Sequence, residues 1–411
     1  MSRPSLRLAC VLLLAATACT TEAATTTSTP EPGATTSPPT TDVSDLPGRL
    51  VVLDGEGDIV TLDPDGSNPT PVTDDAGAGT VYRQPTFSPV ADQLAWAEIS
   101  GAGFGLGSSG GDGADRARVP MSSPPFFTFW SPDGSGIGVL HNSTQGASID
   151  FEMVDVAAGT SQVLASGSPF FFSWSPDSSQ VAVHVELAIF ATLDRIGGTE
   201  DLGATADGYQ APHWTPDGII HLADDGLELR PISGENRVLA TVPGPVSFVA
   251  NPQGTRVAIQ SFAESEAPGI NAAVSPIPAL PVNRVMVLDM ESGELVEAAA
   301  GVSVGLFWSP DGEKLLVLRL GIEGTGELTT VLWADGDSTE LSSMAPHPLF
   351  AQEVLQFFDQ YGQSLQLWSP DSAAFALPGA IDGDTGVWVH ALGGGDPVNV
   401  HDGSWVSWSN R

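Results

Sequence analysis

A six-residue phrase, Phe-Trp-Ser-Pro-Asp-Gly, recurs along this chain and constrains its fold more than any other feature. It stands complete at 129–134 and 307–312, and near copies occur at 173–177, 213–218 and 367–371. Weaker copies lie at 87–89, 251–254 and 407–410. Successive copies begin 36 to 60 residues apart when measured at the proline position, and the spacing is most often near 40. Repetition at such a period predicts an array of similar structural units.

The phrase is suited to a tight turn between two strands. Serine accepts a hydrogen bond at the first position of a type I turn, proline presets φ at the second, and glycine relieves crowding at the fourth. Short apolar runs precede and follow the turn, as at 304–308 and 314–320. Each unit is therefore expected to hold two strands joined by the turn and about two more. Such units must stack to bury their faces, and at this period they indicate an all-β fold, a single β-propeller.

The repeat resembles that of the TolB-like (WD40-like) propellers, whose signature is Trp-Ser-Pro-Asp-Gly followed by a short strand. Five good copies carry the resemblance, which extends over roughly residues 48–411. It implies the propeller fold but little about activity, because propellers carry many unrelated functions. It also favours a protein of the bacterial cell envelope that works through contacts with other proteins.

The spacing predicts eight blades, with seven as the alternative if one of the weaker repeats is misjudged. The first expected strands, at 49–53, 58–62 and 70–73, have no Ser-Pro-Asp strand in front of them. A matching strand appears instead at the other end of the chain, at 404–408. We therefore expect the C-terminal strand to join the N-terminal blade and close the ring, which removes the exposed sheet edges.

The N-terminus predicts export and lipid attachment. Arg3 and Arg7 precede the apolar run 8–16, which is too short to span a bilayer and is typical of a secretory signal peptide. Small residues then lead directly into Cys19, and this resembles the lipobox of bacterial lipoproteins. The resemblance implies that residues 1–18 are removed and that Cys19 carries the lipid, with palmitate among its acyl chains. The protein would then sit on the extracytoplasmic face of the cell membrane; ordinary secretion is the alternative.

The remaining chain divides into a tether and the propeller. Residues 19–46 are rich in Thr, Ser and Pro and are expected to form a disordered tether, because they offer little apolar surface to bury. Residues 47–411 form the propeller, with insertions at 263–281 and 344–364. The second insertion predicts one helix that Pro348 opens and Gly362 closes, with an apolar stripe from Phe350 to Tyr361. Both insertions belong to the face opposite the repeated turns, so we expect the binding surface there, near blades six to eight.

Several recurring residues resemble catalytic or ligand-binding groups, but each set has a structural explanation. The repeated aspartates occupy equivalent turns spread around a ring and cannot converge; they are Asp133, Asp177, Asp217, Asp311 and Asp371. The repeated tryptophans predict packing between blades; they are Trp130, Trp174, Trp214, Trp308, Trp368 and Trp408. Two Gly-x-Ser-x-Gly matches, at 107–111 and 301–305, lack the strand-to-helix setting of a nucleophile elbow. The sequence thus predicts no catalytic residue.

Cofactor signals are weak. The seven histidines are scattered and no paired cysteines occur, so a zinc site is not predicted. Asp-Gly turns at 63–66, 335–337 and 382–384 leave bound Ca²⁺ as a minor alternative. No cofactor-binding or metal-ligating residue is therefore assigned.

Charge narrows the range of partners. The chain carries 14 basic and 50 acidic residues, a net charge of −36, which repels phosphate backbones and disfavours nucleic acid as a partner. The predicted function is a membrane-anchored lipoprotein whose propeller is a binding scaffold. Its partner would be an envelope protein or a sensor, or a small ligand or glycan in the central channel, and the membrane is contacted through the lipid alone. The alternative is a propeller hydrolase, of lactonase or glycosidase type, with its site at the channel mouth.

Overall fold

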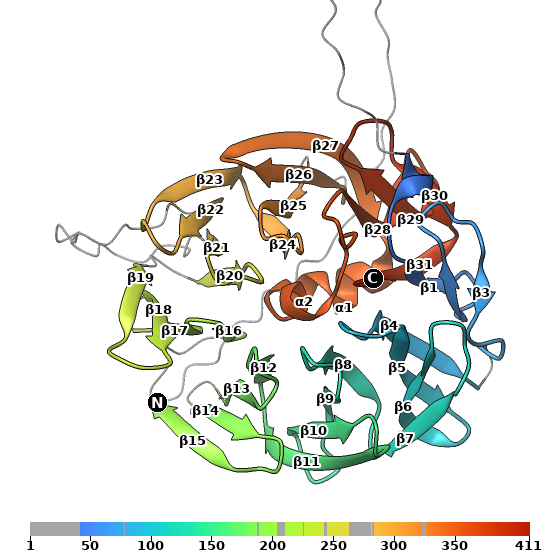
Figure 1. Cartoon of the computed structure of the whole chain (residues 1–411), viewed down its shortest axis with the longest axis horizontal. Helices are drawn as coiled ribbons and strands as arrows, with labels where there is room; N and C mark the ends of the chain where they lie inside the picture. Colours follow the sequence, from blue (N-terminus) through green and yellow to red (C-terminus); the bar gives the residue numbers. More distant parts are fainter. Residues whose placement is uncertain are drawn as a thin grey trace, which may run out of the picture.

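A computed structural model describes residues 42–77, 79–186, 189–203, 210–224, 226–241, 245–262, 281, 283–321 and 326–411. The signal peptide, Cys19 and all of the 263–281 insertion except Pro281 lie outside the described residues. Within the described part of the chain the sheets are arranged radially around one centre, so the all-β propeller is confirmed (Figure 1).

Five sheets are simple antiparallel meanders of four consecutive strands. The first two contain β4 (Val81–Phe87), β5 (Gln93–Ser100), β6 (Gly103–Gly110), β7 (Ala117–Met121), β8 (Pro125–Trp130), β9 (Gly136–Asn142), β10 (Ile149–Asp155) and β11 (Thr160–Gly167). The third and fourth contain β12 (Phe170–Trp174), β13 (Gln180–Val185), β14 (Ile189–Asp194), β15 (Thr199–Gly203), β16 (His213–Thr215), β17 (Gly218–Ala223), β18 (Gly226–Pro231) and β19 (Arg237–Ala240). The fifth contains β20 (Val246–Ala250), β21 (Arg256–Ser261), β22 (Arg284–Asp289) and β23 (Leu295–Ala300).

Two sheets depart from this pattern. One has the order β3-β2-β1-β31 and joins the two ends of the described chain. Its strands are β1 (Leu50–Asp54), β2 (Ile59–Leu62), β3 (Thr70–Pro71) and β31 (Gly403–Trp408), with Leu50 opposite Trp408. The other is a seven-stranded sheet. It contains β24 (Ser303–Trp308), β25 (Lys314–Leu320), β26 (Leu328–Ala334), β27 (Asp337–Pro346), β28 (Ala374–Ile381), β29 (Asp384–Ala391) and β30 (Val398–His401).

Burial explains why the inner strands are apolar runs and the outer strands are not. All five residues of β12, Phe-Phe-Phe-Ser-Trp, are buried, because neighbouring sheets cover both faces of an inner strand. The outermost strand of the adjacent sheet, β11, is mostly solvent-exposed and is rich in small and polar residues. Position in the radial array therefore decides the composition of each strand.

The repeated phrase forms the predicted turns. Ser131 Oγ donates to Asp133 Oδ1 (2.6 Å), and that oxygen also accepts from the backbone N–H of Ser135 (3.0 Å). Two copies have serine in place of the final glycine, and both serines adopt the left-handed conformation, with φ of 62° at Ser178 and 59° at Ser372. The Ser178 hydroxyl accepts the N–H of Asp133 in the preceding turn (3.0 Å), so this serine links neighbouring sheets.

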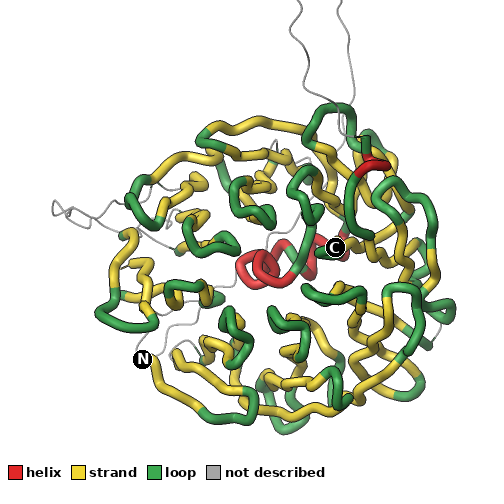
Figure 2. The backbone as a smooth tube through the Cα atoms, viewed as in Figure 1, coloured by secondary structure: helices red, strands yellow, loops and turns green. Residues whose placement is uncertain are grey.

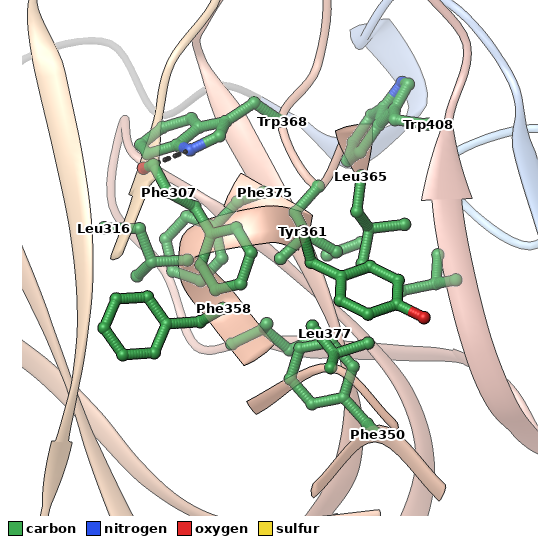
Figure 3. Close-up of a cluster of buried hydrophobic side chains, with 14 of the residues drawn as sticks. Phe307, Leu316, Phe350, Phe358, Tyr361, Leu365, Trp368, Phe375, Leu377 and Trp408 are labelled. Atoms are coloured by element: carbon green, nitrogen blue, oxygen red, sulfur yellow. Dashed lines mark hydrogen bonds between the residues drawn. The ribbon is translucent and has the colours of Figure 1, made fainter. Parts of the chain in front are cut away.

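Three of the six repeated tryptophans form a hydrogen bond with the neighbouring sheet. Trp174 Nε1 donates to the carbonyl of Phe129, and Trp308 Nε1 donates to the carbonyl of Val249 (3.0 and 2.9 Å). Trp368 Nε1 makes the same contact with Phe307 (3.0 Å; Figure 3). The ring therefore adds one directed bond to the apolar contact between successive sheets.

The 344–364 insertion differs from its prediction. It forms α1 (Pro348–Glu353), a 3₁₀ turn η2 (Leu355–Phe357) and α2 (Phe358–Ser364) in place of one helix. Gly362 lies inside α2, where a Cβ would come within 3.0 Å of the Leu306 carbonyl, so this glycine allows close packing. Phe357, expected on the apolar stripe, is 48% exposed. The break at η2 turns Phe357 out of the stripe that Phe350, Val354, Phe358 and Tyr361 otherwise form.

This helical segment occupies the centre of the ring (Figure 2). α2 contacts strands β8, β12, β20 and β24 from four different sheets. Its buried side chains join a shared apolar cluster (Figure 3), which includes Phe307, Leu316, Phe350, Phe358, Tyr361, Leu365, Trp368, Phe375, Leu377 and Trp408. The centre, expected as a channel with room for a ligand, is filled here by the chain itself.

The position of α2 also explains the seven-stranded sheet. In the last repeat the inner strand is reduced to one isolated bridge between Trp368 and Phe375, because the residues before it are helical. The end of β27 takes the vacated place on β28, with Ala345 opposite Ala380. Two repeats are thereby joined into one continuous sheet.

The described chain begins with a 3₁₀ turn, η1 (Val43–Asp45), which Asp42 caps through the N–H of Ser44 (3.1 Å). Leu46, the last residue of the predicted tether, is buried in the core. Among the described residues, no helix has both the length and the apolar character needed to cross a bilayer.

Candidate functional site

Two large cavities of the described chain lie on opposite faces of the ring. The turn bowl, of about 420 Å³, opens among the repeated turns and is lined by Pro132, Pro176, Pro216 and their equivalents, with residues 362–366 as its floor. The helix pocket, of about 400 Å³, is lined by the opposite ends of the strands and by the helical segment. Cavities of this size accommodate small organic molecules.

The helix pocket has apolar walls from three neighbouring sheets. The strand ends at β8 and β12 contribute Phe126, Phe127, Phe170 and Phe171. Phe126 of β8 and Phe357 of η2 both line the pocket and form its exposed rim, at 39% and 48% exposure. The walls provide aromatic surface for an apolar ligand.

The inner end of the helix pocket is polar and centres on Gln84 of β4, which is only 3% exposed. Gln84 Nε2 donates to the Phe126 carbonyl (2.7 Å) and to the Tyr361 hydroxyl (2.7 Å), and lies 3.2 Å from Glu353 Oε2. Gln84 Oε1 is buried and has no hydrogen-bond partner among the described residues. This oxygen is enclosed by protein atoms and does not form part of the accessible surface of the pocket.

Ionic groups near Gln84 neutralise each other. Arg83 Nη1 forms an ion pair with Glu353 Oε1, which ties β4 to α1 across the pocket. Burial, reinforced by the negative charge of Glu353, raises the pKa of Tyr361 well above its ordinary value. Tyr361 therefore stays a neutral phenol at physiological pH, and its ring packs edge-to-face on Phe127 with centroids 5.0 Å apart.

The turn bowl contains polar groups that are already engaged. His213 Nδ1 accepts the N–H of Ala250 (3.2 Å), and its Nε2 lies 3.1 Å from the carbonyl of Asp359, so Nε2 carries the proton. Burial lowers the pKa of His213 to about 3, which keeps the ring neutral. Gln363 joins Ser173 to the Pro212 carbonyl (2.6 and 3.1 Å). A histidine held by two backbone groups has no free nitrogen for proton transfer to a substrate.

A buried His-Glu pair lies in the sheet formed by β8 to β11. His141 Nε2 contacts Glu152 Oε2 (2.7 Å), and the Ser161 hydroxyl donates to the same carboxylate. In a nucleophilic triad the histidine stands between the hydroxyl and the acid, whereas here the acid stands between the other two. We interpret this group as a satisfied polar network in the sheet.

The described residues show where the repeated side chains and the sequence motifs lie. The five repeated aspartates stay in separate turns and do not converge. The serines of the Gly-x-Ser-x-Gly matches, Ser109 and Ser303, lie in β6 and β24 and not at a strand-to-helix turn. At one Asp-Gly turn, Asp63 Oδ2 accepts from Asn68 Nδ2 (2.7 Å). No cluster of three or more His, Cys, Asp or Glu in the described parts of the chain could hold a metal ion.

The helix pocket lies on the face where the binding surface was expected and is lined in part by the 344–364 insertion, but its strand residues come from the sheets of β4, β8 and β12 and not from the blades that carry the insertions. Its key polar residues, Arg83, Gln84 and Glu353, were not predicted. Glu353 is far from Arg83 and Gln84 in the sequence, and none of the three belongs to a motif. The one signal available was the apolar stripe around Tyr361, which places the helical segment on a packed surface.

Comparison with known proteins gives the fold and no family. No family model matches the sequence, and no curated protein matches it. Among solved structures, an oligogalacturonate lyase in complex with manganese is 12% identical over 84% of this chain and 98% of its own, with a TM-score of 0.53. A eukaryotic initiation factor is 12% identical over 88% of this chain and 98% of its own, also at 0.53.

TolB from Acinetobacter baumannii is also similar, at 12% identity over 88% of this chain and 82% of its own, with a TM-score of 0.39. Identities this low show the fold alone, and the TolB score supports no argument about function. The function of this chain must therefore be argued from its own cavities.

Proposed function

We propose that this protein is a lipid-anchored, extracytoplasmic binding module that holds a small, largely apolar ligand in the helix pocket. The scaffold is an eight-bladed propeller if the seven-stranded sheet is counted as two blades, and the pairing of β31 with β1 supports a closed ring. The observation that carries the proposal is an aromatic-walled cavity of about 400 Å³ with a single polar end. Pockets of this composition are typical of small-molecule sites.

Binding is favoured over catalysis by the state of the ionisable groups. Proton transfer needs an acid or base within reach of the substrate and free to change partner. At the helix pocket Arg83 and Glu353 are paired with each other, and in the turn bowl His213 is held by two backbone groups. A hydrolase of lactonase or glycosidase type is the weaker alternative for that reason.

A dye-binding titration tests the pocket. N-phenyl-1-naphthylamine is a neutral aromatic probe whose fluorescence rises in apolar surroundings. We expect saturable binding to the wild type, and at least tenfold weaker binding by Ile149→Trp, because the larger ring fills the pocket from the start of β10. The matched control is Ile189→Trp, at the start of the equivalent strand β14 in the next sheet and outside the pocket lining. Unsaturable binding, or equal binding by Ile149→Trp and the wild type, would contradict the proposal.

Membrane attachment is a separate part of the proposal and rests on the sequence around Cys19. Cells supplied with radiolabelled palmitate are expected to label the wild type and not Cys19→Ala. The unlabelled variant should appear in the soluble extracytoplasmic fraction. Equal labelling of the two proteins would contradict lipid attachment at Cys19 and would leave the pocket proposal unaffected.

An envelope protein or sensor as a second binding partner is supported by one observation. Phe126 and Phe357 form an exposed aromatic rim on the helix face, where an apolar surface of a partner could be buried. A photo-crosslinking residue at position 357 is expected to capture such a partner in intact cells, whereas one at Ile196, on an exposed turn of the opposite face, is not.

A further inference from the structure

We infer that the helix pocket selects neutral aromatic ligands that carry a hydrogen-bond acceptor, such as a ketone, ester or amide carbonyl, and that the guanidinium of Arg83 donates to it. This class of ligand rests on the proposed function and adds the chemistry of the bound molecule to it. Arg83 belongs to β4 and lines the pocket beside Gln84.

The Arg83 side chain has hydrogen-bond donors that no protein group uses. It is 40% exposed, and Nη1 donates to Glu353 Oε1. Nε and Nη2 have no partner among the described residues and are not among the atoms enclosed by protein, so both are accessible. A guanidinium carries five N–H donors in a planar fork. Most of the donors of Arg83 are therefore free to meet a ligand.

Contacts with α1 and an irregular strand hold the guanidinium at the pocket. Glu353 Oε1 accepts from Arg83, and Oε2 lies 3.2 Å from Gln84 Nε2, so both carboxylate oxygens are engaged. Arg83 and Gln84 both line the pocket, although successive residues of a regular strand point to opposite faces. Here Gln84 has a φ of 53°, and the pairing of β4 with β5 shifts register between Arg83 and Thr86. This bulge brings two successive polar side chains to one end of the pocket.

The charge balance at the pocket favours a neutral acceptor over an ion. Arg83 and Glu353 are the charged side chains among the described residues of the lining. An ammonium group would lose water without gaining a free carboxylate, because Arg83 and Gln84 already engage Glu353. A carboxylate would contact Arg83 but would also be repelled by Glu353, in a chain with a net charge of −36. A carbonyl accepts from the guanidinium without either cost.

The test uses the pair 2-acetylnaphthalene and 2-isopropenylnaphthalene, which share one planar shape and differ only in a carbonyl oxygen in place of a CH₂ group. Displacement of N-phenyl-1-naphthylamine measures the affinity of each. The comparison variant combines Arg83→Met with Glu353→Met, which removes the donor together with its counter-charge and adds no new donor. We expect the ratio of ketone to alkene affinity to be roughly fivefold higher in the wild type than in this variant.

The matched control combines Arg118→Met with Glu98→Met. It removes an ion pair of the same sheet (2.9 Å) whose residues do not line the pocket, so it should keep the wild-type ratio. An equal ratio in the wild type and in the Arg83 and Glu353 variant, or an equal fall in the control, would overturn the inference. The proposed function would then stand, because both probes would still bind. Absence of saturable binding by the dye and by both probes would instead remove the proposed function.

A measurement on the wild type alone keeps the inference testable if the Arg83 and Glu353 variant does not fold. In an apolar pocket without a donor, the ratio of ketone to alkene affinity would equal the ratio of their partition coefficients from water into cyclohexane, where the carbonyl loses its hydrogen bonds. We expect the wild-type ratio to exceed that value by about fivefold or more. A wild-type ratio equal to the cyclohexane value would overturn the inference.

Discussion

Asp359 is the residue whose ionisation most directly opposes the fold. It lies in the first turn of α2 at the centre of the ring, where its Oδ2 accepts the N–H of Ala211 (3.2 Å). Burial raises the pKa of this carboxyl to about 6, from an ordinary value of 3.8. The folded state therefore favours the protonated acid, and the charged form is a penalty that grows as pH rises from about 4 to above 6.

Asp359→Asn is predicted to stabilise the protein at pH 7.5 by up to about 3 kcal/mol, because the amide removes the buried charge and its oxygen still accepts from Ala211. At pH 4.0 the carboxyl is protonated in the folded state and already partly protonated in the unfolded state, so the gain should fall to about 0.5 kcal/mol. Urea unfolding at the two pH values measures this, with Asp217→Asn in an exposed turn as the control. A gain of equal size at both pH values would show that the buried charge is not its cause.

Single-residue roles were predictable where they repeat. The turn aspartates and the inter-blade tryptophans could be assigned because one position recurs in several copies of the phrase. Ser178 and Gln84 could not. Ser178 looks like a poor substitute for glycine until the neighbouring turn supplies the N–H of Asp133. The position of Gln84 depends on a strand bulge and on contacts with Glu353 and Tyr361.

At the scale of elements, the α1–η2–α2 segment combines two tasks on adjacent residues. Phe358 is buried in the apolar cluster at the centre of the ring, whereas Phe357 is exposed at the rim of the helix pocket. The 3₁₀ turn between the helices produces this division, because it changes the direction of successive side chains. The segment thus supplies core on one side and a pocket wall on the other.

Alanine substitutions are predicted to separate these tasks. Phe358→Ala should cost about 3–5 kcal/mol of unfolding free energy, since it leaves a cavity among side chains from several sheets. Phe357→Ala should change stability by no more than about 0.5 kcal/mol but weaken binding of N-phenyl-1-naphthylamine. Chemical unfolding and dye titration of the two variants measure both effects. Equal destabilisation by the two substitutions would contradict the division of roles.

The helix was predictable from the spacing of apolar residues, but its interruption and its location were not. The stripe from Phe350 to Tyr361 fits one continuous helix as well as two short ones, because η2 displaces only Phe357 from it. Its burial at the centre depends on contacts with strands of four different sheets, which are far away in sequence. Local periodicity carries no information about which distant strands will meet it.

For the whole molecule, the repeat was sufficient to predict the class of fold, because turn chemistry and period together allow few architectures. The filled centre was not predictable in the same way. It arises where the last repeat gives up most of its inner strand and β27 takes its place on β28. The regular copies predict the ring of sheets. The helical segment that precedes the last repeat fills the centre of this ring, so neither cavity passes through it.

The pairing of β1 with β31 joins the first and the last strand to be synthesised. Leu50 leaves the ribosome long before its partner Trp408, and at 5–20 residues per second the delay is roughly 20–70 s. During that interval β1 has an unpaired edge, in a segment whose residues are almost all apolar. Such an edge invites pairing with other chains. The nascent chain would therefore depend on chaperones that shield this first strand until the last one arrives.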